Sequence, residues 1–112
     1  MIYQKMLSDG ENVIKTFSWN YKQYEFSKSV NELYITNKSI IYIQENFGDH
    51  HKIAIKDVKL ISTSDYSKSD NACYIVYVNP RAHANQGFEF SIGKDDDCLF
   101  EDISEALFKL IG

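Results

Sequence analysis

Three histidines and an aspartate are the residues of this sequence best suited to bind a metal ion. Imidazole and carboxylate groups are zinc ligands, and Asp49 directly precedes His50 and His51, while His83 lies further along the chain. The side chains of adjacent residues on an extended chain point to opposite sides, so His50 and His51 do not easily share one ion. We therefore expect no metal site.

Nucleophilic chemistry and phosphate binding find no support in the spacing of the residues. Cys73 stands inside an apolar run, where a thiol is buried and unreactive, and no Ser-His-Asp or Cys-His arrangement stands out. The five glycines are isolated, at positions 10, 48, 87, 93 and 112, so the sequence has no glycine-rich phosphate loop. We expect a protein that is not an enzyme and binds no cofactor, with a small hydrolase or metal-dependent enzyme as an alternative.

The charge balance argues against nucleic acid as a partner. The 112 residues carry 12 Lys+Arg and 16 Asp+Glu, a net charge of −4, and Arg81 is the single arginine. The acidic excess lies in residues 95–112, where Lys109 stands against six acids. Contacts to phosphates and to guanine require clustered lysine and arginine, so we expect no nucleic-acid binding.

Membrane spanning and secretion are not expected either. The longest uninterrupted apolar run, Cys73 to Val78, is far shorter than the roughly 18–20 residues that cross a bilayer. The polar residues 8–11 interrupt the N-terminal apolar residues before they reach the length of a secretion signal. Cys73 and Cys98 lie far apart, without CxxC spacing, so we expect reduced thiols in a cytoplasmic protein.

The elements that position these residues are predicted to be mainly β-strands. Ile, Val and aromatic residues occur in short runs separated by Gly, Asn, Asp and Ser, which is typical of short strands. Asn37 can accept a positive φ in a tight hairpin, and residues 22–31 and the serine-rich residues 62–71 are expected to be loops. The seven expected strands are 13–21, 32–36, 40–44, 52–56, 58–62, 73–78 and 88–92.

The final segment changes to a helical period. Its acidic residues stand mostly in the first half and Lys109 stands near the end, an arrangement that the helix dipole favours. One apolar stripe must be covered, so we expect this helix, from about Asp97 to Ile111, to close one end of a bent, nearly closed antiparallel barrel. The stripe consists of Leu99, Ile103, Ala106, Leu107 and Leu110.

Two segments of the sequence resemble the bacterial pleckstrin homology-like (PH-like) domains. Residues 7–13, LSDGENV, are similar to the Leu-x-x-Gly-Glu-x-Val opening of that family. Residues 32–42, ELYITNKSIIY, are similar to its Leu-x-x-Thr-[Asn/Asp]-[Lys/Arg]-Arg-Leu-Ile hairpin, although Ser39 stands where the family usually has Arg. The resemblance implies that residues 1–112 form one mainly β, PH-like domain: a barrel of about seven antiparallel strands capped by one C-terminal α-helix.

The resemblance also makes a membrane-surface lipid-binding module an alternative function. Phosphoinositide-binding members of the wider superfamily gather Lys and Arg at the end of the first strand and in the loop that follows. Here Lys15, Lys22 and Lys28 occupy that region, and Lys38 stands in the next hairpin. Contact to lipid would use Lys22, Lys28 and Lys38, but dispersed lysines in a net acidic chain predict weak binding to membranes.

The function that the sequence favours is non-catalytic protein binding. Aromatic residues, tyrosine above all, are enriched at protein interfaces, and the open edge of a strand pairs readily with another chain. We expect a protein-interaction module that binds a partner protein or self-associates into a homo-oligomer, with Trp19 and Tyr21 of the first strand at the interface. The competing expectation is a monomer whose strand edges are covered by residues 2–7.

Overall fold

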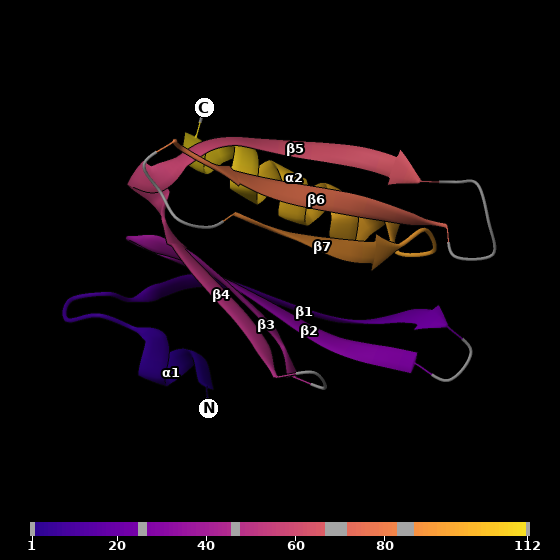
Figure 1. Ribbon diagram of the computed structural model, residues 1–112, viewed down its shortest axis with the longest axis horizontal. Helices are drawn as coiled ribbons and strands as arrows, with labels where there is room; N and C mark the ends of the chain where they lie inside the picture. Colours follow the sequence, from indigo (N-terminus) through magenta and orange to yellow (C-terminus); the bar gives the residue numbers. More distant parts are fainter. Residues whose placement is uncertain (1, 25–26, 46–47, 67–71, 83–86, 112) are drawn as a thin grey trace.

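Two antiparallel sheets and a C-terminal helix make up the computed structural model, which describes residues 2–24, 27–45, 48–66, 72–82 and 87–111 (Figure 1). Sheet A has the strand order β1-β2-β3-β4 and sheet B has the order β5-β6-β7. The strands are β1 Val13–Tyr24, β2 Ser27–Thr36, β3 Ser39–Gln44, β4 Asp49–Ala54, β5 Val58–Tyr66, β6 Cys73–Pro80 and β7 Phe88–Gly93. The helices are α1 Ile2–Met6, the 3-10 turn η2 Ile55–Asp57 and α2 Asp97–Ile111.

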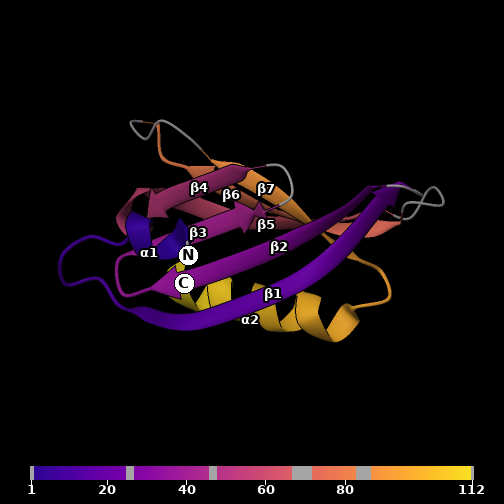
Figure 2. The same ribbon diagram turned by 90° about the horizontal axis from the view of Figure 1, so that it is seen from below.

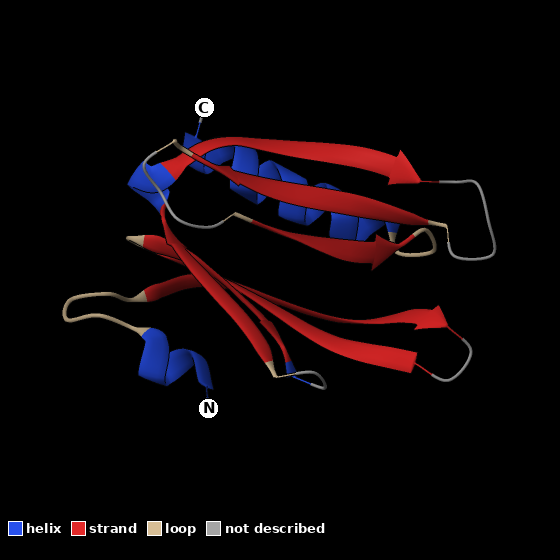
Figure 3. Cartoon of the chain, viewed as in Figure 1, coloured by secondary structure: helices blue, strands red, loops and turns tan. Residues whose placement is uncertain are grey.

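The seven strands confirm the mainly β prediction, but the expected barrel is not closed. Every strand ladder in the described part of the chain lies within one sheet, and none joins sheet A to sheet B. The chain passes from one sheet to the other at η2, the short blue turn between β4 and β5 in Figure 3. Both sheets therefore keep open edges, β1 and β4 in sheet A and β5 and β7 in sheet B.

Two segments that the sequence predicts to be loops are largely strands. The prediction for residues 22–31 is wrong, because β1 continues to Tyr24 and β2 starts at Ser27, with Lys22 opposite Lys28 in the ladder. In the serine-rich segment, β5 continues to Tyr66, which pairs with Cys73, and residues 67–71 lie outside the described residues. Backbone pairing extends both hairpins although their apolar alternation has ended.

Side chains hold the β2–β3 turn, and Asn37 does not adopt the positive φ that it could accept, since no described residue other than glycine has a positive φ. The Thr36 hydroxyl accepts hydrogen bonds from the backbone N–H of Lys38 at 3.0 Å and of Ser39 at 2.7 Å. A threonine turn of this kind closes the chain without a left-handed residue. Asn37 instead uses its side-chain oxygen to accept the N–H of Asn12 at 2.8 Å.

The N-terminal segment covers the outer face of sheet A. Tyr3 of α1 stacks on Tyr34 of β2, with ring centroids 4.3 Å apart. Met6 and Leu7 pack on the same small cluster, whose buried members are Tyr34, Ile41 and Ile43. The structure thus places residues 3–7 on a sheet face, whereas the competing expectation placed them along a strand edge.

A buried ion pair attaches this segment to sheet A. Lys52 Nζ lies 2.8 Å from Glu11 Oε1, and the Glu11 side chain is fully buried. Lys52 also donates to the Met6 carbonyl, and the Thr36 hydroxyl donates to the other Glu11 oxygen at 2.5 Å. Burial by itself raises the pKa of Glu11, but the hydrogen bonds from Lys52, Thr36 and neighbouring groups outweigh burial and lower the pKa to about 2.

Helix α2 spans the predicted residues, Asp97–Ile111, and closes one side of the two sheets. Ile103 and Leu107 are fully buried in a core that includes residues of both sheets. Figure 2 shows α2 beside β1, on the side of the molecule opposite to β4. No helix in the described ranges has the length and apolar character needed to cross a bilayer.

Aromatic rings join the two sheets on the side of β4 and β7. The ring of Phe88 in β7 stacks with His51 of β4, at a centroid distance of 5.4 Å, and with Tyr42 of β3, at 5.9 Å. Tyr42 also stacks with Phe90 of β7 at 5.1 Å. Side chains make the contact between the sheets here, so no ladder of backbone hydrogen bonds joins the described edges of β4 and β7.

Trp19 is a core residue, which corrects its expected place at an interface between copies. Its side chain is only 6% exposed, and its indole N–H donates to the Ser91 carbonyl of β7 at 2.9 Å. The indole also contacts Phe90, with ring centroids 5.4 Å apart. Trp19 therefore fixes β1 against β7 and presents no surface to a second copy. Tyr21 is half-buried, and its packing against the core leaves it facing the cavity described below.

Candidate functional site

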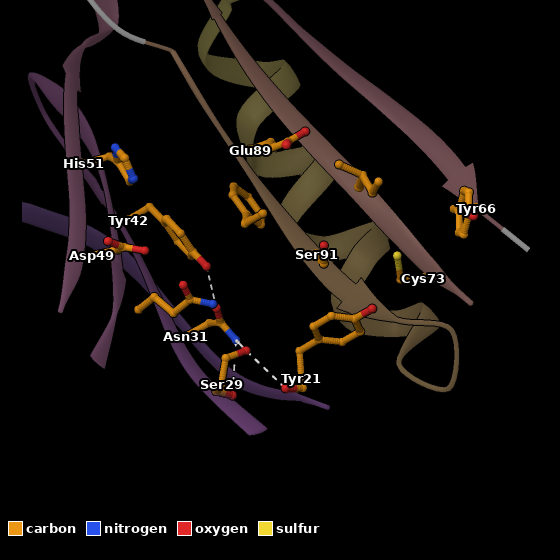
Figure 4. Close-up of a pocket in the computed structure, with 13 residues that line it drawn as sticks. Tyr21, Ser29, Asn31, Tyr42, Asp49, His51, Tyr66, Cys73, Glu89 and Ser91 are labelled. Carbon is orange, nitrogen blue, oxygen red and sulfur yellow. Dashed lines mark hydrogen bonds between the residues drawn. The ribbon is translucent and has the colours of Figure 1, made fainter. Parts of the chain in front are cut away.

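A cavity of about 520 Å³ lies between the two sheets, at the end where β1 finishes and β2 begins (Figure 4). Its volume falls in the range of cavities that bind ligands in proteins, about 300–1,000 Å³. Sheet A contributes Tyr21, Ser29, Asn31, Tyr42, Gln44, Asp49 and His51. Sheet B contributes Tyr66, Cys73, Ile75, Glu89, Phe90 and Ser91.

The floor of the cavity is a chain of hydrogen bonds between polar side chains, drawn as dashed lines in Figure 4. The Tyr42 hydroxyl donates to Asn31 Oδ1 at 2.5 Å, and Asn31 Nδ2 donates to the Ser29 hydroxyl at 3.1 Å. Ser29 in turn donates to the Tyr21 carbonyl at 3.1 Å. Burial, with a smaller effect from the Asp49 charge, raises the pKa of Tyr42, so its hydroxyl stays protonated as a donor. Buried polar groups that are all paired make this floor rigid.

One wall of the cavity is the free edge of β7, which among the described strands pairs with β6 alone. The N–H and C=O of one strand residue point to the same side, and the side alternates along the strand. The Ser91 carbonyl accepts the Trp19 indole N–H and therefore points away from β6. The N–H and C=O of Glu89, two residues earlier, point to that same free side. Within the described residues nothing pairs with these two groups.

The rim of the cavity is acidic. Figure 4 shows Asp49 beside Tyr42 on the sheet A wall and Glu89 across from them on the strand β7. Both carboxylates belong to exposed residues. Among the described lining residues there is no lysine or arginine, and His51 is the one side chain able to carry a positive charge.

The three lysines predicted to contact lipid do not form one site. Lys22 and Lys28 face each other in the β1–β2 ladder, and their side chains lie outside the described residues. Lys38 stands beyond the other end of β2, where its amine donates to the Asp9 carbonyl at 3.0 Å. At about 3.3 Å per residue, the strand separates Lys28 from Lys38 by about 30 Å.

The described histidine and cysteine residues do not gather into a metal site. His50 is exposed, with Nδ1 3.3 Å from the Gly48 carbonyl oxygen, while His51 faces the cavity, as the alternation of a strand predicts. His83 lies outside the described residues. Cys73 is buried, Cys98 is exposed, and both are free thiols. The described ranges contain no group of three or more His, Cys, Asp or Glu placed to hold a metal ion.

The cavity floor was not predicted from the sequence, because Ser29 and Asn31 lie in the segment that was expected to be a loop. Ser29 is 5% exposed and Asn31 is 1% exposed. A signal for their place was present, since the alternation of Leu33 and Ile35 in β2, continued backwards, puts Asn31 and Ser29 on the same inward face. Polar residues that continue the apolar face of a strand indicate that this part of the face lines a polar cavity and does not belong to the apolar core.

Comparison with solved structures identifies the class of fold. The chain superposes on the C-terminal domain of an unknown protein from Leishmania infantum with a TM-score of 0.57 and 17% identity, covering 95% of this chain and 94% of that chain. It superposes on the Vps36 N-terminal PH domain with a TM-score of 0.56 and 18% identity, covering 94% and 82% of the two chains. No protein-family model matches the sequence, and no curated protein matches it at a significant level.

These likenesses show a PH-like fold: a mainly β structure of two antiparallel sheets with a C-terminal helix. The fold implied by the sequence motifs is thereby confirmed in its general form. Membership of the bacterial PH-like family stays a prediction.

Proposed function

We propose that this protein is a non-catalytic interaction module that binds a short extended segment of a partner protein in the cavity beside β7. The observation that carries the proposal is the unpaired N–H and C=O of Glu89, which face a cavity of about 520 Å³. An extended peptide can supply the missing strand, and its backbone hydrogen bonds give affinity while cavity contacts give specificity. Neither an enzymatic reaction nor a cofactor is part of the proposal.

The position of Trp19 limits the length of the added strand. Its indole N–H already donates a hydrogen bond to the Ser91 carbonyl at 2.9 Å. A bound segment therefore pairs with β7 at Glu89 and does not continue along the strand past Ser91. Further contacts come from the floor, where Asn31 and Ser29 are held by their hydrogen bonds. Such a preordered site lowers the entropy cost of binding because few side chains must be fixed.

The PH-like fold supports an interaction module without assigning a partner, and we extend the proposal to a cytoplasmic, bacterial PH-like protein as the sequence suggests. A second copy of the chain is not the proposed partner, because Trp19 is buried in the core. Lipid is not the proposed ligand, because Lys38 lies at the opposite end of β2 from Lys22 and Lys28.

A selection from a displayed library of random decapeptides tests the proposal. We expect enriched peptides that lose at least about tenfold in affinity for the Glu89→Pro variant, since proline removes the N–H that the segment needs. Glu89→Ala, which keeps the N–H and removes the carboxylate, is the control and separates the backbone contact from the side-chain contact. Affinity is measured by fluorescence polarisation with a synthetic copy of the most enriched peptide.

Mapping on the unmodified protein provides a second measurement in case Glu89→Pro does not fold. We expect the peptide to shift the backbone amide NMR signals of Glu89 and Asn31. A library without enrichment, or peptides that shift signals elsewhere and leave these two unchanged, would show that the cavity is not the binding site.

A further inference from the structure

We infer that the segment bound beside β7 is basic, and that Asp49 and Glu89 at the cavity rim bind its lysine or arginine side chains. This inference deepens the proposed function and rests on it. It names the chemistry of the partner, an extended peptide with cationic side chains, where the proposed function names only the backbone contact.

The two rim carboxylates have no partner within the described residues, although other acids of the chain do. Glu11 is paired with Lys52, and Asp65 with Lys94. No described cation or hydrogen-bond donor contacts the carboxylate of Asp49 or Glu89, and no lysine or arginine is found among the described lining residues. The rim therefore presents negative charge without internal compensation, and a cationic ligand complements it.

The two carboxylates lie close to the open strand edge. Glu89 carries the free backbone N–H and C=O, so a peptide residue paired opposite it has its own side chain next to the Glu89 carboxylate, while the side chains of its two neighbours point to the other face, toward sheet A. Asp49 lies on the facing wall beside Tyr42, where Figure 4 shows it at the cavity. A segment paired with β7 thus has the Asp49 carboxylate near the face turned toward sheet A and the Glu89 carboxylate near its other face.

The aromatic surface along the cavity suits long cationic side chains. Tyr21 is half-buried and Tyr66 is 50% exposed, and both line the cavity. Lysine and arginine pack their methylene groups along such rings and keep the charge at the end free to reach a carboxylate. A cation over the face of a tyrosine is attracted by the ring as well.

Three pools of synthetic decapeptides test the inference. Each pool is random in neutral residues except at position five, which is fixed as Lys, Gln or Glu. We expect the Lys pool to bind the protein about tenfold more tightly than the Gln pool at low salt, and the Glu pool to bind more weakly than both. Raising the salt to about 0.5 M is expected to shrink the preference because it screens exposed charges.

The variant Asp49→Asn/Glu89→Gln is expected to lose the preference for lysine while still binding the Gln pool. Glu101→Gln, which removes an exposed carboxylate from α2 away from the cavity, is the matched control and is expected to keep it. Equal affinity of all three pools, with the Glu89 amide signal still shifted, overturns the basic-segment inference and leaves the proposed function standing. Failure of every pool to bind overturns both.

Discussion

Trp19→Ala is expected to lower the free energy of unfolding by about 3–5 kcal/mol, the usual loss for removing a large aromatic side chain from a core. Trp19 is 6% exposed, packs against Phe90 and Tyr42, and joins the sheets through the Ser91 carbonyl. Removal leaves both a cavity and an unpaired carbonyl. A domain of this size has a total stability of about 5–15 kcal/mol, so the loss is a large part of it.

Urea denaturation followed by circular dichroism measures this loss, with Trp19→Phe as the control. Phenylalanine keeps most of the ring volume but cannot donate to Ser91, so its expected loss is smaller than that of the alanine variant by at least about 1 kcal/mol. Equal losses for the two variants would mean that the packing of the indole contributes little, which contradicts its place in the core.

Leu107→Ala is expected to cost about 2–5 kcal/mol, through lost burial and the cavity left behind. Leu107 has no exposed surface and lies with Ile103 in the core that both sheets share. The same denaturation measurement checks the prediction. Phe108→Ala, one residue along on the exposed face, is the control and is expected to have a small effect, since Phe108 is 46% exposed. A loss below about 0.5 kcal/mol for Leu107→Ala would show that α2 is a loosely attached tail.

The elements with clear apolar periodicity could be predicted from the sequence. The stripe of Leu99, Ile103 and Leu107 has a helical period, and the 15-residue helix begins and ends where predicted. The strand 52–56 shows how far alternation alone can mislead at its ends. Asp49, His50 and His51 belong to β4 although they are polar, and the chain turns at Ile55, which was expected to be in the strand.

The ends of the long hairpins could not be predicted from apolar alternation, because polar residues there are held by the ladder and by one another. Ser29 and Asn31 face inward, yet they line a cavity and are paired by hydrogen bonds instead of by apolar packing. Residues of this kind suggest a loop when each is judged by its own preference for loops and turns. Pairing with the neighbouring strand β1 holds these residues in an extended conformation, and their own sequence does not show this pairing.

The candidate site depends on how the two sheets meet, and this is why its acidic rim was not foreseen. Asp49 and Glu89 are 40 residues apart in sequence and lie on different sheets. Composition located the acidic excess at residues 95–112, where the acids belong to α2 and the turn before it. Only the packing of β4 beside β7, through the rings of His51 and Phe88, brings the two rim carboxylates to one cavity.

The edge of β7 is open to the cavity at Glu89, and residue-resolved amide hydrogen exchange by NMR tests this without any ligand. We predict slow exchange for the amides of Phe88, Phe90 and Ile92, which point toward β6, and fast exchange for the amide of Glu89. Addition of a selected peptide is predicted to slow the exchange of Glu89 alone among these four. An amide of Glu89 that is as protected as that of Phe90 in the free protein would contradict the account, because the edge would then be paired already.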